Sequence, residues 1–193
     1  TSAPEITISD ANHKEVGRLH RSDFRHITIC AITLDAFTEL AARAQHLRSV
    51  GIDIGQHSVW ALSIDDLRVY ADLFENPLIF LHFVEQRVRA IHSELVDLDD
   101  EMDHLGLYVA ENNYSLYAAE LLGSDTAKLT FNGYRTPIDE YYSAIVHGEP
   151  TVRPRQKMPE RLTEIVGFLA DCEKQGRAEI ASFLLDAAGD HRE

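Results

Sequence analysis

Residues 76–92 read NPLIFLHFVEQRVRAIH, and this stretch decides the fold of the chain. Asn76 can cap a helix that starts at Pro77, because proline is favoured at the first helical position, where no backbone N–H is needed. Large apolar side chains then fill the helix: Leu78, Ile79, Phe80, Leu81, Phe83, Val84, Val88 and Ile91. So apolar a helix belongs in an interior rather than on a surface. We therefore expect a helix over 77–92 at the centre of the core.

Two further helices are predicted beside this central one. Ser63 and Asp66 form a Ser-x-x-Asp capping signal, which predicts a helix from Ile64. The signal directly follows a short predicted strand over 58–62. A third helix is expected over 95–111. Its apolar stripe lies beneath an acidic run that we expect to face water: Asp97, Asp99, Asp100, Glu101 and Asp103.

The first third of the chain is predicted to supply a strand-helix-strand element. Residues 1–25 are polar and are interpreted as an irregular lead. The β-branched run 27–32 is apolar on both faces, which predicts a strand buried within a sheet. Apolar residues at helical spacing then predict an amphipathic helix over 35–48, and this helix leads back to the strand over 58–62.

Beyond residue 111, the sequence signals for secondary structure are weak up to about residue 131 and become stronger from Pro137 onward. A short helix over 114–122 and a short strand over 128–131 are expected. Pro137 opens a further helix that Gly148 closes. Three prolines within 149–159 indicate an extended connector.

The chain is therefore predicted to be a mixed α/β protein that is mostly helical. Its expected order is a short strand-helix-strand element, a helical bundle and a C-terminal helical hairpin, whose two helices are separated by Gly176. The corresponding divisions are an irregular lead at 1–25, a mixed α/β to helical core at 26–148, a proline-rich connector at 149–159 and the hairpin at 160–193.

Composition bounds the classes of function. The 193 residues are 45% hydrophobic, which fits a globular chain with one core. No apolar run approaches the roughly 18 residues of a spanning helix, so no membrane partner is expected. Cys30 and Cys172 are too few for a disulfide scaffold and favour a cytoplasmic location. The net charge of −14, concentrated in 51–147, allows only local nucleic-acid contacts.

The connector is a local exception to this acidity. Arg153, Arg155 and Lys157 lie within five residues of one another. Guanidinium and ammonium groups at such spacing could contact a phosphate or an acidic partner. A solvated basic loop is the other interpretation of the same residues.

Glu101 and His104 raise the question of a metal site. They form a Glu-x-x-His, the spacing that directs a carboxylate and an imidazole toward a metal in di-iron bundles. Such a site needs a second copy, and no other histidine has a Glu three residues before it. We therefore interpret the pair as part of a solvated acidic face and expect no metal and no cofactor.

Arg87 and His92 fit the pattern Arg-x4-His, as do Arg21 and His26. This spacing resembles the active-site signature of the HEPN ribonucleases, small all-helical enzymes. The resemblance implies that the arginine steadies a phosphate while the histidine exchanges a proton. Val88 stands where that family usually has a polar residue, and the predicted strands depart from an all-helical fold.

Three segments carry a second resemblance: VWALSIDDL at 59–67, NPLIFLHFVEQR at 76–87 and DEMDHLGLY at 100–108. Together they resemble a block of uncharacterised bacterial proteins in which it follows a nuclease-related, restriction-endonuclease-like domain. The block spans about a quarter of the chain and implies a cytoplasmic, defence-linked multidomain protein. The Asp/Glu-x-Lys signature of such nucleases has no match at Lys128, Lys157 or Lys174, so no catalytic role is carried over.

These observations favour a noncatalytic assembly, sensing or regulatory module of a larger cytoplasmic bacterial protein. Its expected partner is another protein or a second copy of the chain. The alternative is a nucleic-acid hydrolase, either HEPN-like with Arg87 and His92 as catalytic residues or a remnant of a restriction-endonuclease-like nuclease. The first interpretation requires the helix over 77–92 to be an interior scaffold rather than a reactive surface.

Overall fold

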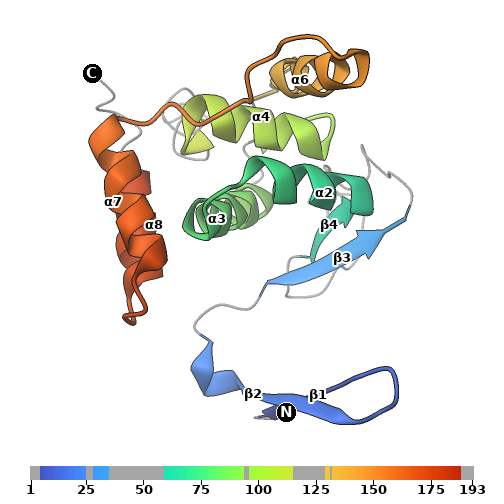
Figure 1. Ribbon diagram of the computed structural model, residues 1–193, viewed down its shortest axis with the longest axis vertical. Helices are drawn as coiled ribbons and strands as arrows, with labels where there is room; N and C mark the ends of the chain where they lie inside the picture. Colours follow the sequence, from blue (N-terminus) through green and yellow to red (C-terminus); the bar gives the residue numbers. More distant parts are fainter. Residues whose placement is uncertain are drawn as a thin grey trace.

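The computed structural model describes residues 5–24, 28–34, 59–93, 96–114, 129–130 and 132–187. Its helices are α2 (Ile64–Leu73), α3 (Pro77–Ser93), α4 (Glu101–Glu111), α6 (Thr136–His147), α7 (Glu160–Asp171) and α8 (Arg177–Ala187). Its strands are β1 (Glu5–Ser9), β2 (Glu15–His20), β3 (Ile29–Thr33), β4 (Val59–Ser63), β5 (Val96–Asp97) and β6 (Leu129–Thr130). The predicted class, mixed α/β and mostly helical, is confirmed (Figure 1).

The described strands pair two by two. β1 and β2 form an antiparallel hairpin, whereas β3 pairs with β4 and β5 pairs with β6 in parallel. The register of β3 and β4 places Cys30 opposite Trp60 and Ile32 opposite Leu62. β4 runs directly into α2, and this brings Trp60 and Leu62 into the core.

The helix starts predicted at Ser63 and Asn76 are both confirmed. The Ser63 hydroxyl accepts from the Asp66 backbone N–H at 3.0 Å, and the Asp66 carboxylate accepts from the Ser63 N–H at 2.8 Å. Asn76 Oδ1 accepts from the Leu78 N–H at 2.9 Å. These caps satisfy amide groups that the first helical turn leaves unpaired, and they fix the corner between α2 and α3.

α3 lies at the centre of the core, as its sequence predicts. α2, α4 and the hairpin of α7 and α8 surround it in Figure 1. The Phe83 ring is fully buried, with ring centroids 5.1 Å from Tyr70, 5.3 Å from Phe74 and 5.2 Å from Tyr108. Aromatic pairs at such distances add to the free energy of area burial. Phe83 therefore joins α2, α3 and α4 in one cluster.

The predictions for α4 are wrong in two respects. The helix begins at Glu101 rather than at residue 95, because residues 96–97 form β5 and the Asp100 carboxylate caps α4 by accepting from the Asp103 N–H. The expected solvated acidic face is also absent, since every residue of 101–108 is buried. α3 packs against one part of α4, and α6 packs against another part. The α4 carboxylates of Glu101 and Asp103 accept hydrogen bonds from Arg87 and Arg135 inside the protein.

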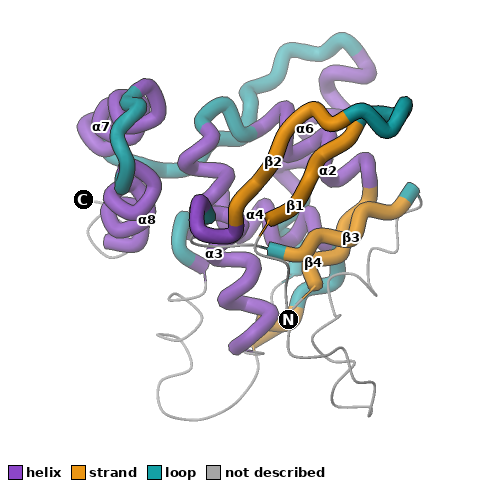
Figure 2. Tube along the Cα trace, turned by 90° about the horizontal axis from the view of Figure 1, so that it is seen from below, coloured by secondary structure: helices purple, strands orange, loops and turns teal. Residues whose placement is uncertain are grey.

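Two predictions for the first third of the chain are also wrong. The lead predicted to be irregular contains the β1–β2 hairpin, in which Ile6 is opposite Leu19, and the hairpin lies apart from the helices in Figure 1. Figure 2 shows its two strands side by side. β3 is not buried on both faces: Cys30 is exposed and Ile32 is 52% exposed. The predicted helix over 35–48, and that over 114–122 beyond Tyr114, lie outside the described residues.

The C-terminal helices follow the predicted order. Gly148 ends α6 in the left-handed region, with φ 68°, where glycine is favoured. The connector then leads to α7, which pairs with α8 as the expected hairpin. A second apolar cluster fixes this hairpin to α3 and consists of Leu78, Val166, Ala181 and Leu185. None of the described helices is long and apolar enough to cross a membrane.

Replacing Phe83 with Ala should lower the free energy of unfolding by about 3–5 kcal/mol, because the change leaves a cavity at a fully buried position. Val146→Ala is the control, since Val146 on α6 is 81% exposed. Urea unfolding measures both. A loss below about 1 kcal/mol for Phe83→Ala would contradict the central position of α3.

Candidate functional site

A buried ion pair joins α3 to α4. Arg87 Nε lies 3.0 Å from Glu101 Oε1, Arg87 Nη2 lies 3.1 Å from Oε2, and both side chains are only 1% exposed. Glu101 Oε1 also accepts from Trp60 Nε1 at 2.6 Å and from the Tyr70 hydroxyl at 3.1 Å. The Glu101 carboxylate therefore connects β4, α2, α3 and α4 at one point.

The Glu101 carboxylate favours the charged form of the Arg87 guanidinium. Burial lowers the pKa of the Arg87 guanidinium, but the charge of Glu101 outweighs burial and raises the pKa above its ordinary value. Burial and the same carboxylate raise the pKa of Tyr70 well above its usual range. A phenol in this environment stays protonated, so Tyr70 serves as a hydrogen-bond donor.

The structure separates the two members of the Arg-x4-His pattern. Arg87 is turned inward to Glu101, whereas His92 is exposed near the end of α3. The second copy of the pattern, Arg21 with His26, cannot be compared because His26 lies outside the described residues. In this conformation the Arg87 guanidinium is occupied by a carboxylate of the same chain.

Glu101 and His104 do not converge on one ligand position. Glu101 is bound by Arg87, and the buried His104 ring lies 5.8 Å from the Tyr114 ring. Across the part of the chain that the structure describes, no group of three or more His, Cys, Asp or Glu side chains could hold a metal ion. The interpretation of His104 as the edge of a solvated face is wrong, because the helix is covered.

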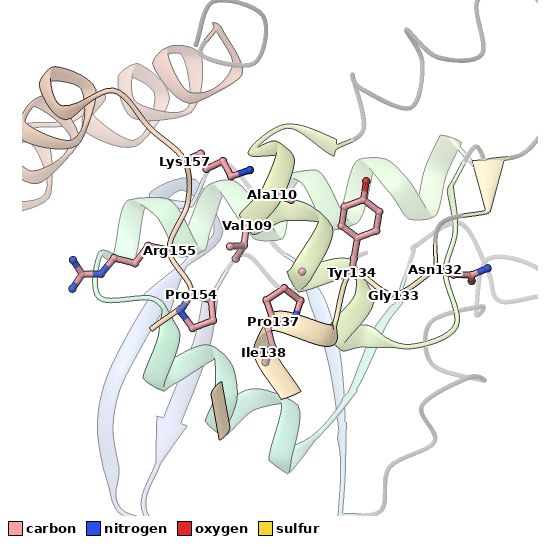
Figure 3. Close-up of a pocket in the computed structure, with 11 residues that line it drawn as sticks. Val109, Ala110, Asn132, Gly133, Tyr134, Pro137, Ile138, Pro154, Arg155 and Lys157 are labelled. Carbon is pink, nitrogen blue, oxygen red and sulfur yellow. The ribbon is translucent and has the colours of Figure 1, made fainter. Parts of the chain in front are cut away.

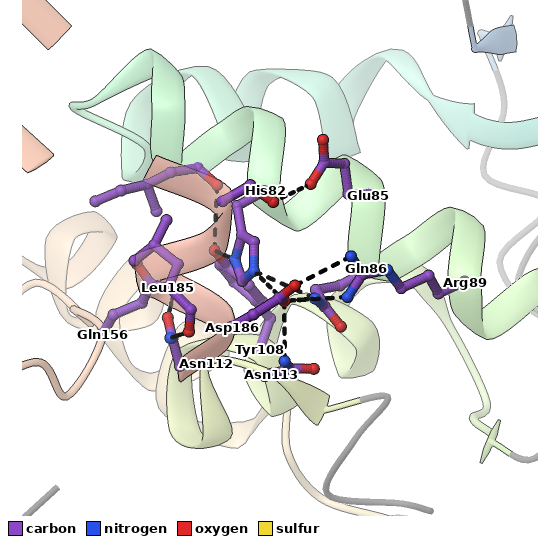
Figure 4. A network of polar contacts seen from close by, with 12 residues as sticks. His82, Glu85, Gln86, Arg89, Tyr108, Asn112, Asn113, Gln156, Leu185 and Asp186 are labelled. Atoms are coloured by element: carbon purple, nitrogen blue, oxygen red, sulfur yellow. Dashed lines mark hydrogen bonds and ion pairs between the residues drawn. The ribbon is translucent and has the colours of Figure 1, made fainter. Parts of the chain in front are cut away.

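A second polar cluster joins the C-terminal hairpin to α3 (Figure 4). Asp186 on α8 accepts at 3.0 Å from His82 Nε2, Gln86 Nε2, Arg89 Nη1 and Asn113 Nδ2, all on its Oδ1 atom. Arg89 Nη2 also donates to Asp186 Oδ2 at 3.1 Å. One carboxylate of α8 therefore receives donors from α3 and from the segment that follows α4.

These donors stabilise the charged form of the Asp186 carboxylate. Partial burial raises the pKa of this carboxyl, but hydrogen bonds from His82 and Arg89 outweigh burial and lower the pKa to about 2. The other ring nitrogen of His82 lies 2.8 Å from the Tyr108 hydroxyl. Burial raises the pKa of Tyr108 well above its usual range, so this hydroxyl is no nucleophile. The cluster is suited to holding the hairpin in place.

The connector is bound to the helices through its basic residues. Arg153 donates to Asp72 on α2 at 3.2 Å and to Glu75, just after α2, at 2.7 Å. Arg155 lies 3.6 Å from Glu75 and is 73% exposed, and Lys157 is exposed. Of the three predicted phosphate or partner contacts, Arg153 is thus occupied within the chain, whereas Lys157 has no ion pair among the described residues.

A pocket of about 580 Å³ lies beside the connector (Figure 3). α4, the start of α6 and the connector form its walls, and Gly106 is one of its lining residues. A Cβ atom at Gly106 would lie 2.0 Å from the Tyr134 carbonyl oxygen, so glycine is needed for α4 to approach the turn before α6. Sequence patterns give no signal for this close approach.

Glu101→Gln should lower the free energy of unfolding by about 3–5 kcal/mol, because it leaves the buried Arg87 cation without a counter-charge. Glutamine keeps an oxygen that can accept from Trp60 and Tyr70. Asp65→Asn is the control, since it breaks the exposed pair with Arg68 and should cost less than about 1 kcal/mol. Equal losses of unfolding free energy for the two variants in chemical denaturation would show that the buried pair stabilises the fold no more than an exposed pair does.

Asp186→Asn should remove pH-dependent stability. The folded pKa of about 2 lies below the unfolded value of about 3.9, so the stabilisation is complete above about pH 5 and is lost as the pH falls through 2. The difference in unfolding free energy between wild type and variant should be about 2 kcal/mol at neutral pH and shrink below about pH 4. Thermal unfolding across this pH range measures this difference in unfolding free energy, with the exposed Asp171→Asn as the control. A difference that does not change with pH would contradict the prediction.

Comparison of the chain with protein-family models, curated protein sequences and solved structures finds no match. The resemblances to HEPN ribonucleases and to the block of nuclease-related bacterial proteins therefore stay predictions.

Proposed function

We propose that the chain is a noncatalytic assembly module that associates with a second copy of itself through its C-terminal hairpin. The surface concerned consists of four exposed apolar side chains, which we call the hairpin apolar residues: Ile165, Phe168, Ile180 and Phe183. This surface is the observation that carries the proposal.

The exposure of these residues is unusual for their type. Phe168 and Phe183 are each 73% exposed. Phe168 follows Ile165 by three positions on α7, and Phe183 follows Ile180 by three positions on α8, so each helix presents an adjacent apolar pair. Exposed apolar side chains of this size are typical of protein interaction sites, because covering them removes apolar area from water.

Charge favours the hairpin as the place where a second copy would associate. Two chains that each carry −14 repel one another most strongly where their acidic residues gather. Residues 51–147 carry seventeen acidic and five basic side chains, whereas residues 148–193 carry nine and seven. The hairpin belongs to this nearly balanced segment, so association there costs the least electrostatic repulsion.

The polar clusters support a noncatalytic role. The most buried charged groups, Arg87 and Glu101, neutralise one another, and Asp186 is occupied by donors from α3. Each cluster joins secondary-structure elements within the chain. Groups so occupied stabilise the fold and offer no open position to a reacting atom.

The wider setting belongs to the same proposal. The resemblance of residues 59–67, 76–87 and 100–108 supports membership of a larger, defence-linked bacterial protein that carries a nuclease-related domain. The free thiols of Cys30 and Cys172, of which Cys30 is exposed, support a reducing cytoplasmic location. In such a protein the chain would bring two copies together.

Sedimentation velocity over a range of protein concentrations tests the assembly. Wild type should form a dimer, and the double variant Phe168→Ser with Phe183→Ser should remain monomeric while keeping the far-UV circular dichroism spectrum of the folded chain. Val152→Ser is the control, since Val152 is 88% exposed and lies on the connector; this variant should still dimerise. A monomeric wild type, or a dimer that survives the double variant, would overturn the proposed interface.

A nuclease assay tests the noncatalytic role. Purified wild-type protein is incubated with RNA and DNA beside His92→Ala, and the proposal predicts no cleavage by either. Cleavage that wild type performs and His92→Ala loses, at an unchanged melting temperature, would contradict the proposal and favour the HEPN-like alternative. Because His92 is exposed, the substitution should leave the fold intact.

A further inference from the structure

We propose that the pocket between α4, the start of α6 and the connector binds a small organic anion with an apolar body. This inference goes beyond the assembly role and does not depend on it. The pocket volume of about 580 Å³ lies within the usual range of small-molecule sites. Figure 3 shows the residues that surround it.

The walls of the pocket are mostly apolar. Val109 and Ala110 come from α4, Pro137 and Ile138 from the start of α6, and Pro154 from the connector. Tyr134 adds an aromatic ring at the side near α6 (Figure 3). A hydrophobic or aromatic body would replace water along these walls, and this burial supplies affinity.

The charge of the pocket departs sharply from that of the chain. The sequence holds thirty-two acidic residues, yet none of the described Asp or Glu side chains lines this pocket, whereas Arg155 and Lys157 both do. The charged side chains described at its walls are therefore both cationic. The adjoining pocket across the connector, of about 480 Å³, is instead lined by Glu75 as well as by Arg155. The preference for an anion therefore applies to the first pocket.

Lys157 is the residue that we expect to contact the anionic group. Its side chain extends from the connector toward α4, whereas Arg155 extends away from Tyr134 and Pro137 (Figure 3). Arg155 also lies near Glu75, while Lys157 has no ion pair among the described residues. An ammonium without a carboxylate beside an apolar pocket favours a carboxylate, sulfonate or phosphate ester at the rim.

The ligand should be small rather than a polymer. A long nucleic acid would be repelled by the net negative charge of the chain, most of which residues 51–147 carry, and this repulsion opposes binding. A single anionic group at Lys157 with its body against α4 and α6 avoids that repulsion. The chemical class is therefore an amphipathic organic anion.

The test uses 1-anilinonaphthalene-8-sulfonate, which combines an aromatic body with one sulfonate. Wild type should bind one molecule per chain in a fluorescence titration, and Lys157→Ala should weaken binding about tenfold. Lys174→Ala is the matched control, because it removes one exposed ammonium from the turn between α7 and α8. N-phenyl-1-naphthylamine, the same body without the sulfonate, should bind wild type as weakly as the sulfonate binds Lys157→Ala.

Three outcomes would overturn the inference. The first is the absence of saturable binding by wild type, and the second is equal affinity in Lys157→Ala and Lys174→Ala. The third is loss of binding in the Phe168→Ser, Phe183→Ser variant, which would place the probe on the hairpin apolar residues instead. That double variant should bind the sulfonate probe with wild-type affinity. The proposed pocket and the proposed dimer interface are therefore tested independently of each other.

Discussion

The buried pair of Arg87 and Glu101 is the constraint on which the rest of the structure depends. Two charges removed from water are tolerable only when each is fully matched. Glu101 therefore needs the donors of Trp60, Tyr70 and Arg87 at once, and these come from β4, α2 and α3. The hydrophobic cluster around Phe83 supplies most of the burial, whereas this polar centre specifies how the elements meet.

The C-terminal hairpin is also held by apolar burial together with one polar cluster. Leu78, Val166 and Leu185 bury the apolar side of the hairpin against α3. Asp186 then fixes its orientation by accepting four donors on one oxygen. With the inner faces of α7 and α8 fixed in this way, Phe168 and Phe183 are left on the outside of the molecule. The fold thus explains why an assembly surface lies there.

Local signals in the sequence predict much of this fold. The capping residues Ser63 and Asn76, the apolar run of α3 and the glycine at 148 act within a few residues, and each element that they predict is present. α4 was mispredicted because its character depends on distant residues. The acidic neighbours of Glu101 and Asp103 in the sequence suggest that both side chains face water. Their burial is explained by donors from Arg87 and Arg135, which lie outside α4.

The candidate sites were less predictable for the same reason. The Arg-x4-His spacing drew attention to Arg87 but could not reveal that Glu101 occupies its guanidinium. The basic residues of the connector were identified from sequence, yet their different roles follow from geometry: Arg153 binds α2, whereas Lys157 faces a pocket. The pocket itself depends on the contact between Gly106 and the turn at Tyr134, which no local pattern reports.

The central claim is that α3 is an interior scaffold held by its pairing with α4. Native-state hydrogen exchange of the α3 amides tests it most directly, because amides at the centre of a core exchange only when the whole chain unfolds. The account predicts that the amides around Phe83 and Arg87 are among the slowest to exchange and share the free energy of global unfolding. Exchange as fast as that of the separate β1–β2 hairpin would contradict it.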